Sequence, residues 1–180
     1  MDNTKAGWRE CADAGLWVVE TQEKALTAAL RSAGEQVAVR RLTPLPSADV
    51  LFTVSGQLVG VERKAASDLV TSWVGALQKC VEDCEDCGGK GCPHLGSQLQ
   101  RMRRNVDHVV LVIEGWLGKN ERGYIETATH KHRVLWDGLW NTLSKWQGRG
   151  VEIQMTLDIQ HTAKRLISLR AYLTRRGKLS

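Results

Sequence analysis

Apolar residues recur along the chain with two periods, one typical of buried strands and one typical of helices. Short apolar or alternating runs predict six strands, at residues 16–20, 37–41, 49–54, 58–64, 109–113 and 151–157. Apolar positions three and four residues apart predict five helices, at residues 25–33, 67–77, 98–104, 134–146 and 161–175. Because strands and helices interleave, the pattern predicts an α/β fold with a mixed central β-sheet flanked by helices.

Turn residues join two of these strands. Ser55-Gly56-Gln57 lies between the strands at 49–54 and 58–64, which are therefore predicted to pair as a β-hairpin. Residues 119–131 are polar and contain glycine, and we predict a loop there. Trp136 and Trp140 are one helical turn apart, and we expect both to fill the core.

Length and composition narrow the class of protein. The 180 residues suit a single domain spanning 1–180, with its core at about residues 15–175. Apolar residues make up 42% and charged residues 25%, which excludes wholesale disorder. No apolar stretch reaches the length of a membrane span, and residues 1–5 lead into no signal-peptide core. A net charge of +5 favours an anionic partner such as nucleic acid, with a solvated basic surface as the alternative.

The hairpin carries the residues with the clearest chemical potential. Asp49 lies on one strand, and Glu62 and Lys64 lie on the next. Glu62 and Lys64 are two residues apart, so their side chains leave the same face of the strand. Two carboxylates and an ammonium on one face suit phosphodiester hydrolysis, because carboxylate oxygens hold magnesium or manganese. The alternative is an exposed strand edge with ordinary ion pairs.

Residues 61–69 (VERKAASDL) resemble the VERK-x3-DL signature of the XPF-type family of structure-specific endonucleases, within the PD-(D/E)XK superfamily. Other segments match that family in order: residues 19–24, the pair Ala48-Asp49, Gln98, and the apolar run ending at Glu114. The chain departs from the pattern at Glu20, Gln22 and Ala48, where the family has Asp, Arg and Gly.

The resemblance implies a restriction-endonuclease-like PD-(D/E)XK fold and a set of site residues. It implies Asp49 and Glu62 as magnesium or manganese ligands, with Glu20 or Glu23 completing the acidic pocket, and Lys64 as the catalytic lysine. It also implies Arg63 and Asp68 as supporting site residues. From the strand alone, Arg63 faces away from Glu62, so we expect it to pair with an acid such as Asp68. Asp68 is also explained as a first-turn acid that the helix dipole favours.

A cysteine-rich segment at residues 80–94 interrupts the chain between two predicted helices. Its spacing, C-x3-C-x2-C-x4-C-x-H, suits a structural tetrahedral zinc site. Four ligands are expected from five candidates, Cys80, Cys84, Cys87, Cys92 and His94. Free thiols and a redox pair are the alternatives, and the segment is interpreted as an insertion into the nuclease core.

Together these features predict a divalent-metal-dependent DNA endonuclease. The resemblance implies branched, flap or junction DNA as substrate, in DNA repair, recombination or phage DNA processing. The alternative is a non-catalytic, zinc-containing DNA-binding module or an inactive nuclease-like scaffold subunit. We expect DNA as a partner, a homodimer or a partner protein in addition, and no membrane. The expected location is the cytoplasm of a bacterial or phage-infected cell, or its nucleoid, without secretion.

Overall fold

The computed structural model describes residues 5–42, 47–75 and 94–177, and these form two β-sheets with six helices. The larger sheet has the strand order β2-β1-β3-β4-β5-β9. Its strands are β1 (Trp17–Glu20), β2 (Val37–Arg40), β3 (Val50–Val54), β4 (Gln57–Ala65), β5 (His108–Glu114) and β9 (Val151–Thr156). β3 runs antiparallel to both β1 and β4, whereas the pairs β1–β2, β4–β5 and β5–β9 are parallel. The predicted mixed sheet is confirmed.

The predicted hairpin is formed by β3 and β4. Val54 pairs with Gln57, so Ser55 and Gly56 form a two-residue turn. Both have positive φ, 50° and 79°, as a type I′ turn requires. The register pairs Val50 with Val61, and the Asp49 amide donates to the Val61 carbonyl at 2.8 Å. Asp49 therefore lies next to Glu62 across the pair, on the same face of the sheet.

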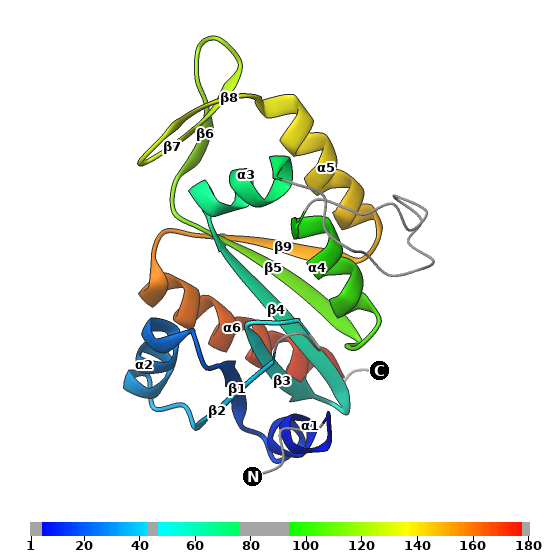
Figure 1. Cartoon of the computed structure of the whole chain (residues 1–180). Helices are drawn as coiled ribbons and strands as arrows, with labels where there is room; N and C mark the ends of the chain where they lie inside the picture. Colours follow the sequence, from blue (N-terminus) through cyan, green and yellow to red (C-terminus); the bar gives the residue numbers. More distant parts are fainter. Residues whose placement is uncertain (1–4, 43–46, 76–93, 178–180) are drawn as a thin grey trace.

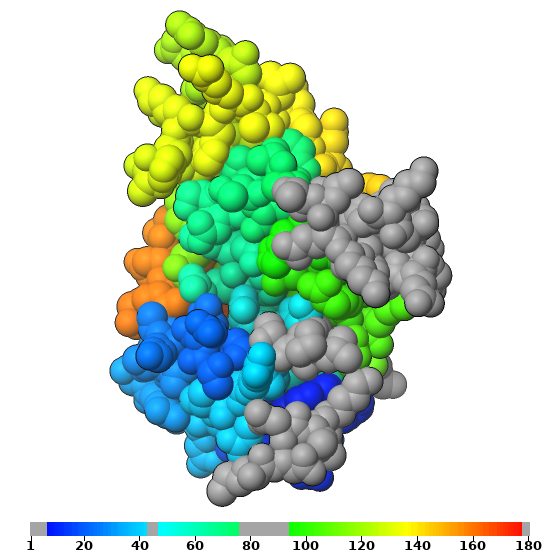
Figure 2. Space-filling model, in the orientation of Figure 1, coloured from blue at the N-terminus to red at the C-terminus, as the bar shows by residue number. Residues whose placement is uncertain are grey.

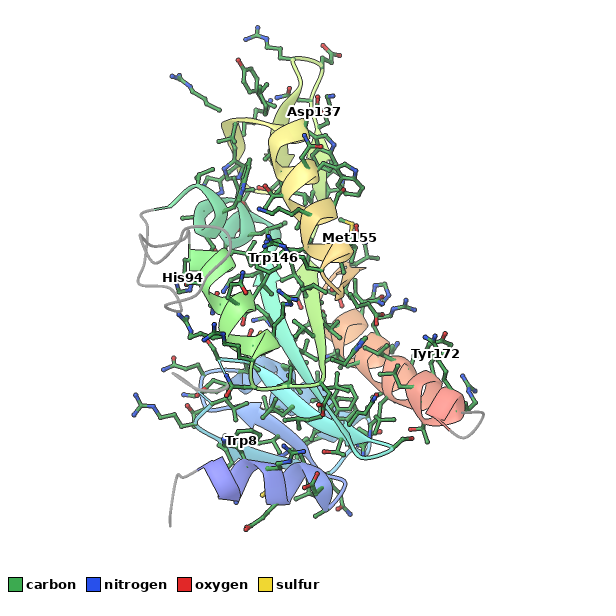
Figure 3. All side chains as sticks on the ribbon, turned by 90° about the vertical axis from the view of Figure 1, so that its right-hand side faces the viewer. Trp8, His94, Asp137, Trp146, Met155 and Tyr172 are labelled. Carbon is green, nitrogen blue, oxygen red and sulfur yellow. The ribbon has the colours of Figure 1, made fainter. Side chains whose placement is uncertain are left out.

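Helices cover both faces of the larger sheet (Figures 1 and 3). On β5, Val109, Leu111 and Ile113 face one core cluster, while Val110 and Val112 face the other. The first face, called here the α3–α4 face, is covered by α1 (Lys5–Asp13), α3 (Ala66–Val74), α4 (His94–Arg103) and α5 (Trp136–Gly148). The second, the α2–α6 face, is covered by α2 (Lys24–Ser32) and α6 (Ile159–Gly177). With both faces buried, the central strands read as continuous apolar runs.

The segment predicted as a polar loop at residues 119–131 is instead part of a small antiparallel sheet. It contains β6 (Leu117–Lys119), β7 (Tyr124–Thr127) and β8 (Lys131–Leu135), called here the wing. Figures 1 and 2 show the wing projecting from one end of the molecule. The prediction was wrong because strands of three to five residues bury few side chains, such as Leu117 and Ile125, and leave little periodicity.

Three smaller expectations also differ from the structure. Helix α1 was not predicted, and α3 begins at Ala66 after an Ala65 N-cap rather than after Ser67. Trp136 does pack against the core, but Trp140 is 48% exposed and stacks on Trp136 with ring centroids 5.7 Å apart. Among the described helices, none is long and apolar enough to cross a bilayer.

Candidate active site

Three of the predicted site residues meet at the C-terminal end of β4, on the α3–α4 face. Glu62 is fully buried, with 1% of its surface exposed, and Lys64 Nζ lies 2.6 Å from its Oε1. Asp49, half-buried beside them, accepts a hydrogen bond from the Arg63 amide through Oδ2 at 2.7 Å. The hairpin register and the two-residue period of β4 thus bring together Asp49, Glu62 and Lys64, as the sequence predicts.

The buried acid is short of hydrogen-bond donors. Neither oxygen of Glu62 has a well-directed hydrogen bond among the described residues, although Oε1 contacts Lys64 as an ion pair. Gln98 on α4 acts on Glu62 as a hydrogen-bonding neighbour that lowers its pKa, yet Gln98 Oε1 is itself buried without a partner in the described chain. Buried polar atoms are seldom left in this state, so these oxygens fit a site that receives a further polar or cationic group.

The two carboxyl groups of the site, Asp49 and Glu62, lie close together, and each disfavours ionisation of the other. Burial raises the pKa of Asp49 well above its ordinary value, and the neighbouring charge of Glu62 raises it further. Burial also raises the pKa of Glu62, while the charge and hydrogen bond of Lys64 act to lower it. Two adjacent carboxyls with raised pKa values cannot both ionise at low cost unless positive charge is added. The arrangement therefore favours a cation.

The opposite face of the same sheet edge carries an ion network centred on Arg63. Its Nε lies 2.9 Å from Glu23 Oε2 and its Nη2 3.2 Å from Glu23 Oε1. Its Nη1 lies 2.9 Å from Glu114 Oε1. Burial acts to lower the pKa of Arg63, but its bonds to Glu23 and the charge of Glu114 raise it overall. Arg63 thus ties β4 to the start of α2 and the end of β5.

The network continues into the last helix. Glu114 Oε2 accepts a hydrogen bond from the Thr162 hydroxyl at 2.7 Å, and Thr162 Oγ1 lies 2.7 Å from Thr156 Oγ1.

Sequence reasoning missed Thr156 and Thr162, since isolated threonines carry no motif. It was right that Arg63 faces away from Glu62, but the proposed partner Asp68 is wrong. Asp68 is exposed in the first turn of α3, and Arg63 pairs with Glu23 and Glu114 instead.

Glu20 lies on the same face as Asp49, but its carboxylate is occupied by the protein. Oε1 accepts from the Thr21 amide at 2.8 Å and from the Thr21 hydroxyl at 2.5 Å. Oε2 accepts from the Leu42 amide at 2.6 Å. Glu23 is similarly held by Arg63. Of the four acids that the resemblance implies as metal ligands, Asp49 and Glu62 are therefore the two with oxygen atoms available.

Two side chains of α4 lie near the acids, His94 beside Lys64 and Arg101 beside Ser47. The pKa of His94 is lowered by burial and by the positive charges of Lys64 and Arg101, which places His94 near the site. Arg101 Nε donates to Ser47 Oγ at 3.3 Å, and Ser47 has φ of 68° two residues before Asp49. A residue in this left-handed region is strained, and such strain concentrates at functional sites. Figure 3 shows His94 at the beginning of α4.

The predicted zinc site lies outside the described part of the chain, except for His94. Cys80, Cys84, Cys87 and Cys92 fall within residues 76–93. Across the described ranges, no three His, Cys, Asp or Glu side chains are grouped so that they could hold a metal ion. Magnesium commonly binds through one or two carboxylates and keeps several waters, so Asp49 and Glu62 still fit such an ion.

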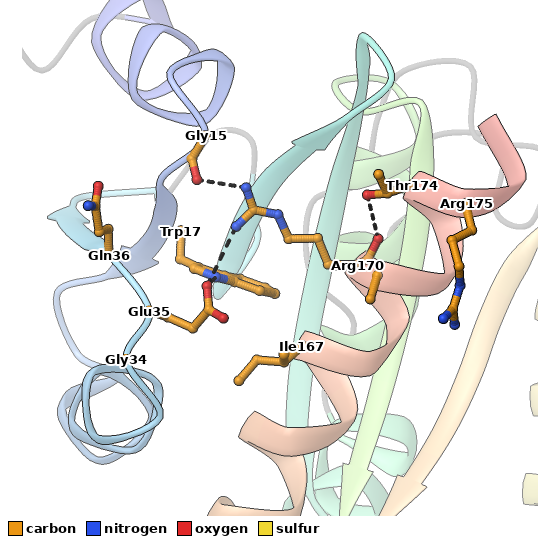
Figure 4. Close-up of a pocket in the computed structure, with 10 residues that line it drawn as sticks. Gly15, Trp17, Gly34, Glu35, Gln36, Ile167, Arg170, Thr174 and Arg175 are labelled. Carbon is orange, nitrogen blue, oxygen red and sulfur yellow. Dashed lines mark hydrogen bonds and ion pairs between the residues drawn. The ribbon is translucent and has the colours of Figure 1, made fainter. Parts of the chain in front are cut away.

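A hollow of about 570 Å³ lies at the end of β1 away from the acids and is lined by Trp17, Glu35 and Arg170 (Figure 4). The Arg170 guanidinium donates to the Gly15 carbonyl at 2.7 Å, pairs with Glu35 at 3.8 Å and lies over the Trp17 ring at 5.1 Å. Trp17 Nε1 donates to Glu35 at 2.6 Å. These polar groups are satisfied by one another, so this hollow is explained by the docking of α6 against β1.

The end of the larger sheet that carries Asp49 and Glu62 is called here the acidic edge. Most of the chain, including this end, matches a known family. The model of the ERCC4 domain matches residues 19–169, which include Asp49, Glu62, Lys64, Arg63 and Glu114. The chain belongs to the ERCC4 domain family. No curated protein sequence matches it. The family confirms the resemblance identified from the sequence.

Solved structures with a similar fold include two of XPF from Aeropyrum pernix. The match to the first covers 90% of this ERCC4 chain and 64% of the XPF chain, with 22% sequence identity and a TM-score of 0.60. The second, a complex with DNA, covers 90% of this chain and 66% of that one, with 22% identity and a TM-score of 0.62. The chain thus spans slightly less than two thirds of these proteins, and the likeness concerns the fold.

The Arg63 network predicts a large loss of stability on its removal. Arg63→Met leaves Glu23 and Glu114 without their shared counterion, and we expect the free energy of unfolding to fall by about 2–3 kcal/mol. Urea unfolding followed by circular dichroism measures it. Arg9→Met, which removes an exposed pair with Asp13, is the matched control and should change stability by less than about 1 kcal/mol. Equal stability of the two variants would contradict the network's role.

The raised pKa of Asp49 predicts a pH-dependent gain in stability for Asp49→Asn. Above the ordinary value of 3.8, the folded state holds more protons than the unfolded state, so wild-type stability falls as pH rises from 3.8 toward the raised pKa. Asparagine does not ionise and can still accept from the Arg63 amide. We therefore expect the variant to be more stable than wild type at pH 7.

Urea unfolding between pH 3 and pH 8, in EDTA, measures the difference. It should shrink as pH falls through 3.8, where Asp49 is protonated in both states. Glu121→Gln, at an exposed acid of the wing, should show no such trend. A stability difference that does not vary with pH would show that Asp49 ionises without penalty.

Proposed function

We propose that this ERCC4 domain is a divalent-metal-dependent DNA endonuclease that hydrolyses phosphodiester bonds. The observation that carries the proposal is the pair of adjacent carboxylates, Asp49 and Glu62, with Lys64 Nζ 2.6 Å from Glu62 on the same strand. Supporting it are the family membership and the similar fold of a protein whose structure was solved with DNA.

The charged residues of the site have different proposed roles. Lys64 holds Glu62 in place and supplies an ammonium that can stabilise negative charge developing on a phosphate. Arg101 adds positive charge near the acids, which attracts a phosphodiester to this end of the sheet, whereas the lowered pKa of His94 favours its neutral form. Arg63, held on the opposite face, fixes the backbone amide that binds Asp49. Arg63 therefore acts as a positioning residue.

Asp49 and Glu62 are the residues that would hold a magnesium or manganese ion. Their oxygens fit a hard cation, because neither Glu62 oxygen has a well-directed hydrogen bond among the described residues and both carboxyls have raised pKa values. When bound, such an ion lowers the pKa of a coordinated water and neutralises charge on phosphate oxygens. Glu20 and Glu23 would act indirectly, because their carboxylates hold Thr21, Leu42 and Arg63.

The finer parts of the proposal rest on the resemblance to XPF-type enzymes. They are a preference for branched, flap or junction DNA, a homodimer or protein partner, and a role in repair, recombination or phage DNA processing inside a bacterial or phage-infected cell. The chain is treated as one nuclease domain with residues 80–94 as an insertion.

Cleavage of a labelled panel tests the function. Duplex, single-stranded, flap, forked and four-way-junction DNA are incubated with magnesium or manganese. Wild type should cut at least one branched substrate, and Asp49→Ala and Lys64→Ala should each lower the rate by about 10²–10³-fold while DNA affinity is kept. Asp13→Asn, at an exposed acid of α1, is the control and should cut like wild type. Binding of DNA without metal-dependent cleavage by wild type would favour the non-catalytic module.

The cysteine-rich segment is proposed to hold a structural zinc ion. Elemental analysis of purified protein should find about one zinc per chain, and Cys84→Ser with Cys87→Ser should remove it because thiolates are its main ligands. Cys11→Ser, at a half-buried cysteine on α1, should retain the metal. Wild-type protein without zinc would exclude the site and leave the thiols free.

A further inference from the structure

The wing continues directly from the strand that anchors the acidic edge. β5 ends at Glu114, whose carboxylate binds Arg63, and Trp116 follows two residues later. The register pairs Lys64 with Ile113 and Ala65 with Glu114, so the wing begins at the same end of the sheet as the candidate active site. A Cβ on the intervening Gly115 would lie 4.0 Å from the Ala66 Cβ, at the start of the helix that follows Lys64. The wing and the helix that follows Lys64 therefore leave the sheet side by side.

Trp116 is held as an open aromatic surface. Its side chain is 51% exposed, and its ring lies against Gly118 of β6, the strand that Trp116 precedes. A Cβ at Gly118 would lie 2.5 Å from Trp116 Cζ2, so only glycine allows this approach. The six-membered ring of the indole thus lies close to the Gly118 backbone, and about half of the side chain remains exposed to a ligand. A rigid, half-open aromatic ring is the type of surface on which an unpaired base stacks.

Basic side chains surround this ring. A hollow of about 670 Å³ is lined by Trp116, Lys119, Arg122 and Lys131, together with Asn120, Glu121 and Glu126. Lys119 pairs with Asp137 at 3.2 Å and Lys131 with Glu126 at 3.6 Å, and both lysine side chains are exposed, so these pairs are weak. Arg122 has no ion-pair partner among the described residues. The hollow therefore offers three cationic side chains beside one exposed aromatic ring, the combination on which single-stranded nucleic acid binds.

We propose that the wing is a binding subsite for single-stranded DNA, with an unpaired base stacked on Trp116 and the adjoining phosphates on Lys119, Arg122 and Lys131. Single-stranded DNA is the stated occupant because bases within a duplex are stacked on each other and cannot reach a flat indole. The subsite would hold the unpaired arm of a branched substrate next to the scissile bond. This inference rests on the proposed nuclease function and names the part of the substrate that the wing recognises.

Binding measured without catalysis tests the subsite. Affinity for a fluorescent oligo-dT and for an abasic oligomer of equal length is measured by anisotropy in EDTA, using the full chain. Trp116→Ala should weaken oligo-dT binding roughly tenfold, and Trp116→Phe should lose less because it keeps a ring. Gly118→Val should have a similar effect to Trp116→Ala, since it displaces the indole while every charge is kept. Arg122→Ala should weaken binding to both oligomers and lower the salt dependence by about one phosphate contact.

Two comparisons decide the outcome. Trp140→Ala, at another half-exposed tryptophan on α5, should bind like wild type, and Trp116→Ala should bind the abasic oligomer like wild type. Three results would overturn the subsite. Trp116→Ala could bind oligo-dT as tightly as wild type, or it could lose as much affinity for the abasic oligomer as for oligo-dT. The third is that folded wild type binds no single-stranded DNA. A change of oligomeric state on Trp116→Ala would assign the ring to a protein interface instead. Failure of the nuclease function is seen separately, as absence of cleavage of branched DNA by wild type.

Discussion

The acidic edge of the sheet depends on one electrostatic constraint, the placement of two carboxylates side by side where little water reaches them. Glu62 is fully buried on β4, and Asp49 lies next to it across the hairpin. Within the described chain, Lys64 and Gln98 compensate Glu62, and the Arg63 amide binds Asp49. Such an arrangement costs stability because each charge is desolvated near a like charge. A fold that retains it gains a place where an added cation is strongly favoured.

The rest of the edge keeps that constraint in position. The two-residue period of β4 puts Glu62 and Lys64 on the α3–α4 face and sends Arg63 to the other face. There Arg63 joins Glu23 and Glu114, and Glu114 continues through Thr162 to Thr156. The network links α2, β4, β5, α6 and β9, so the backbone that carries the acids is fixed from behind. Glu20 plays a comparable part by holding the chain at Leu42, shortly before Asp49.

The topology also explains why the proposed hydrolysis site and the proposed DNA-binding wing would lie at the same end of the sheet. β4 and β5 are parallel neighbours, and the register pairs Ala65 with Glu114. Their C-terminal ends therefore lie side by side, one leading into α3 and the other into the wing. In open α/β sheets this is the edge at which ligands bind, because the connections that leave the strands surround it. The other large hollow lies at the opposite end of β1, where Arg170 and Glu35 satisfy each other.

The sequence by itself determined the six strands of the larger sheet, the hairpin and the shared face of Glu62 and Lys64, because these depend on residues close together in the chain. The same local period showed that Arg63 points the other way. Only the tertiary structure decided that its partners are Glu23 and Glu114 rather than Asp68, since that choice depends on the strand order that brings distant segments together. It also decided that Glu20 is occupied by Thr21 and Leu42, and that residues 119–131 belong to a sheet. Hydrogen bonds and ion pairs between residues far apart in the sequence leave no local pattern. The wing strands are too short to show a clear two-residue period, so the sequence pattern could not reveal either.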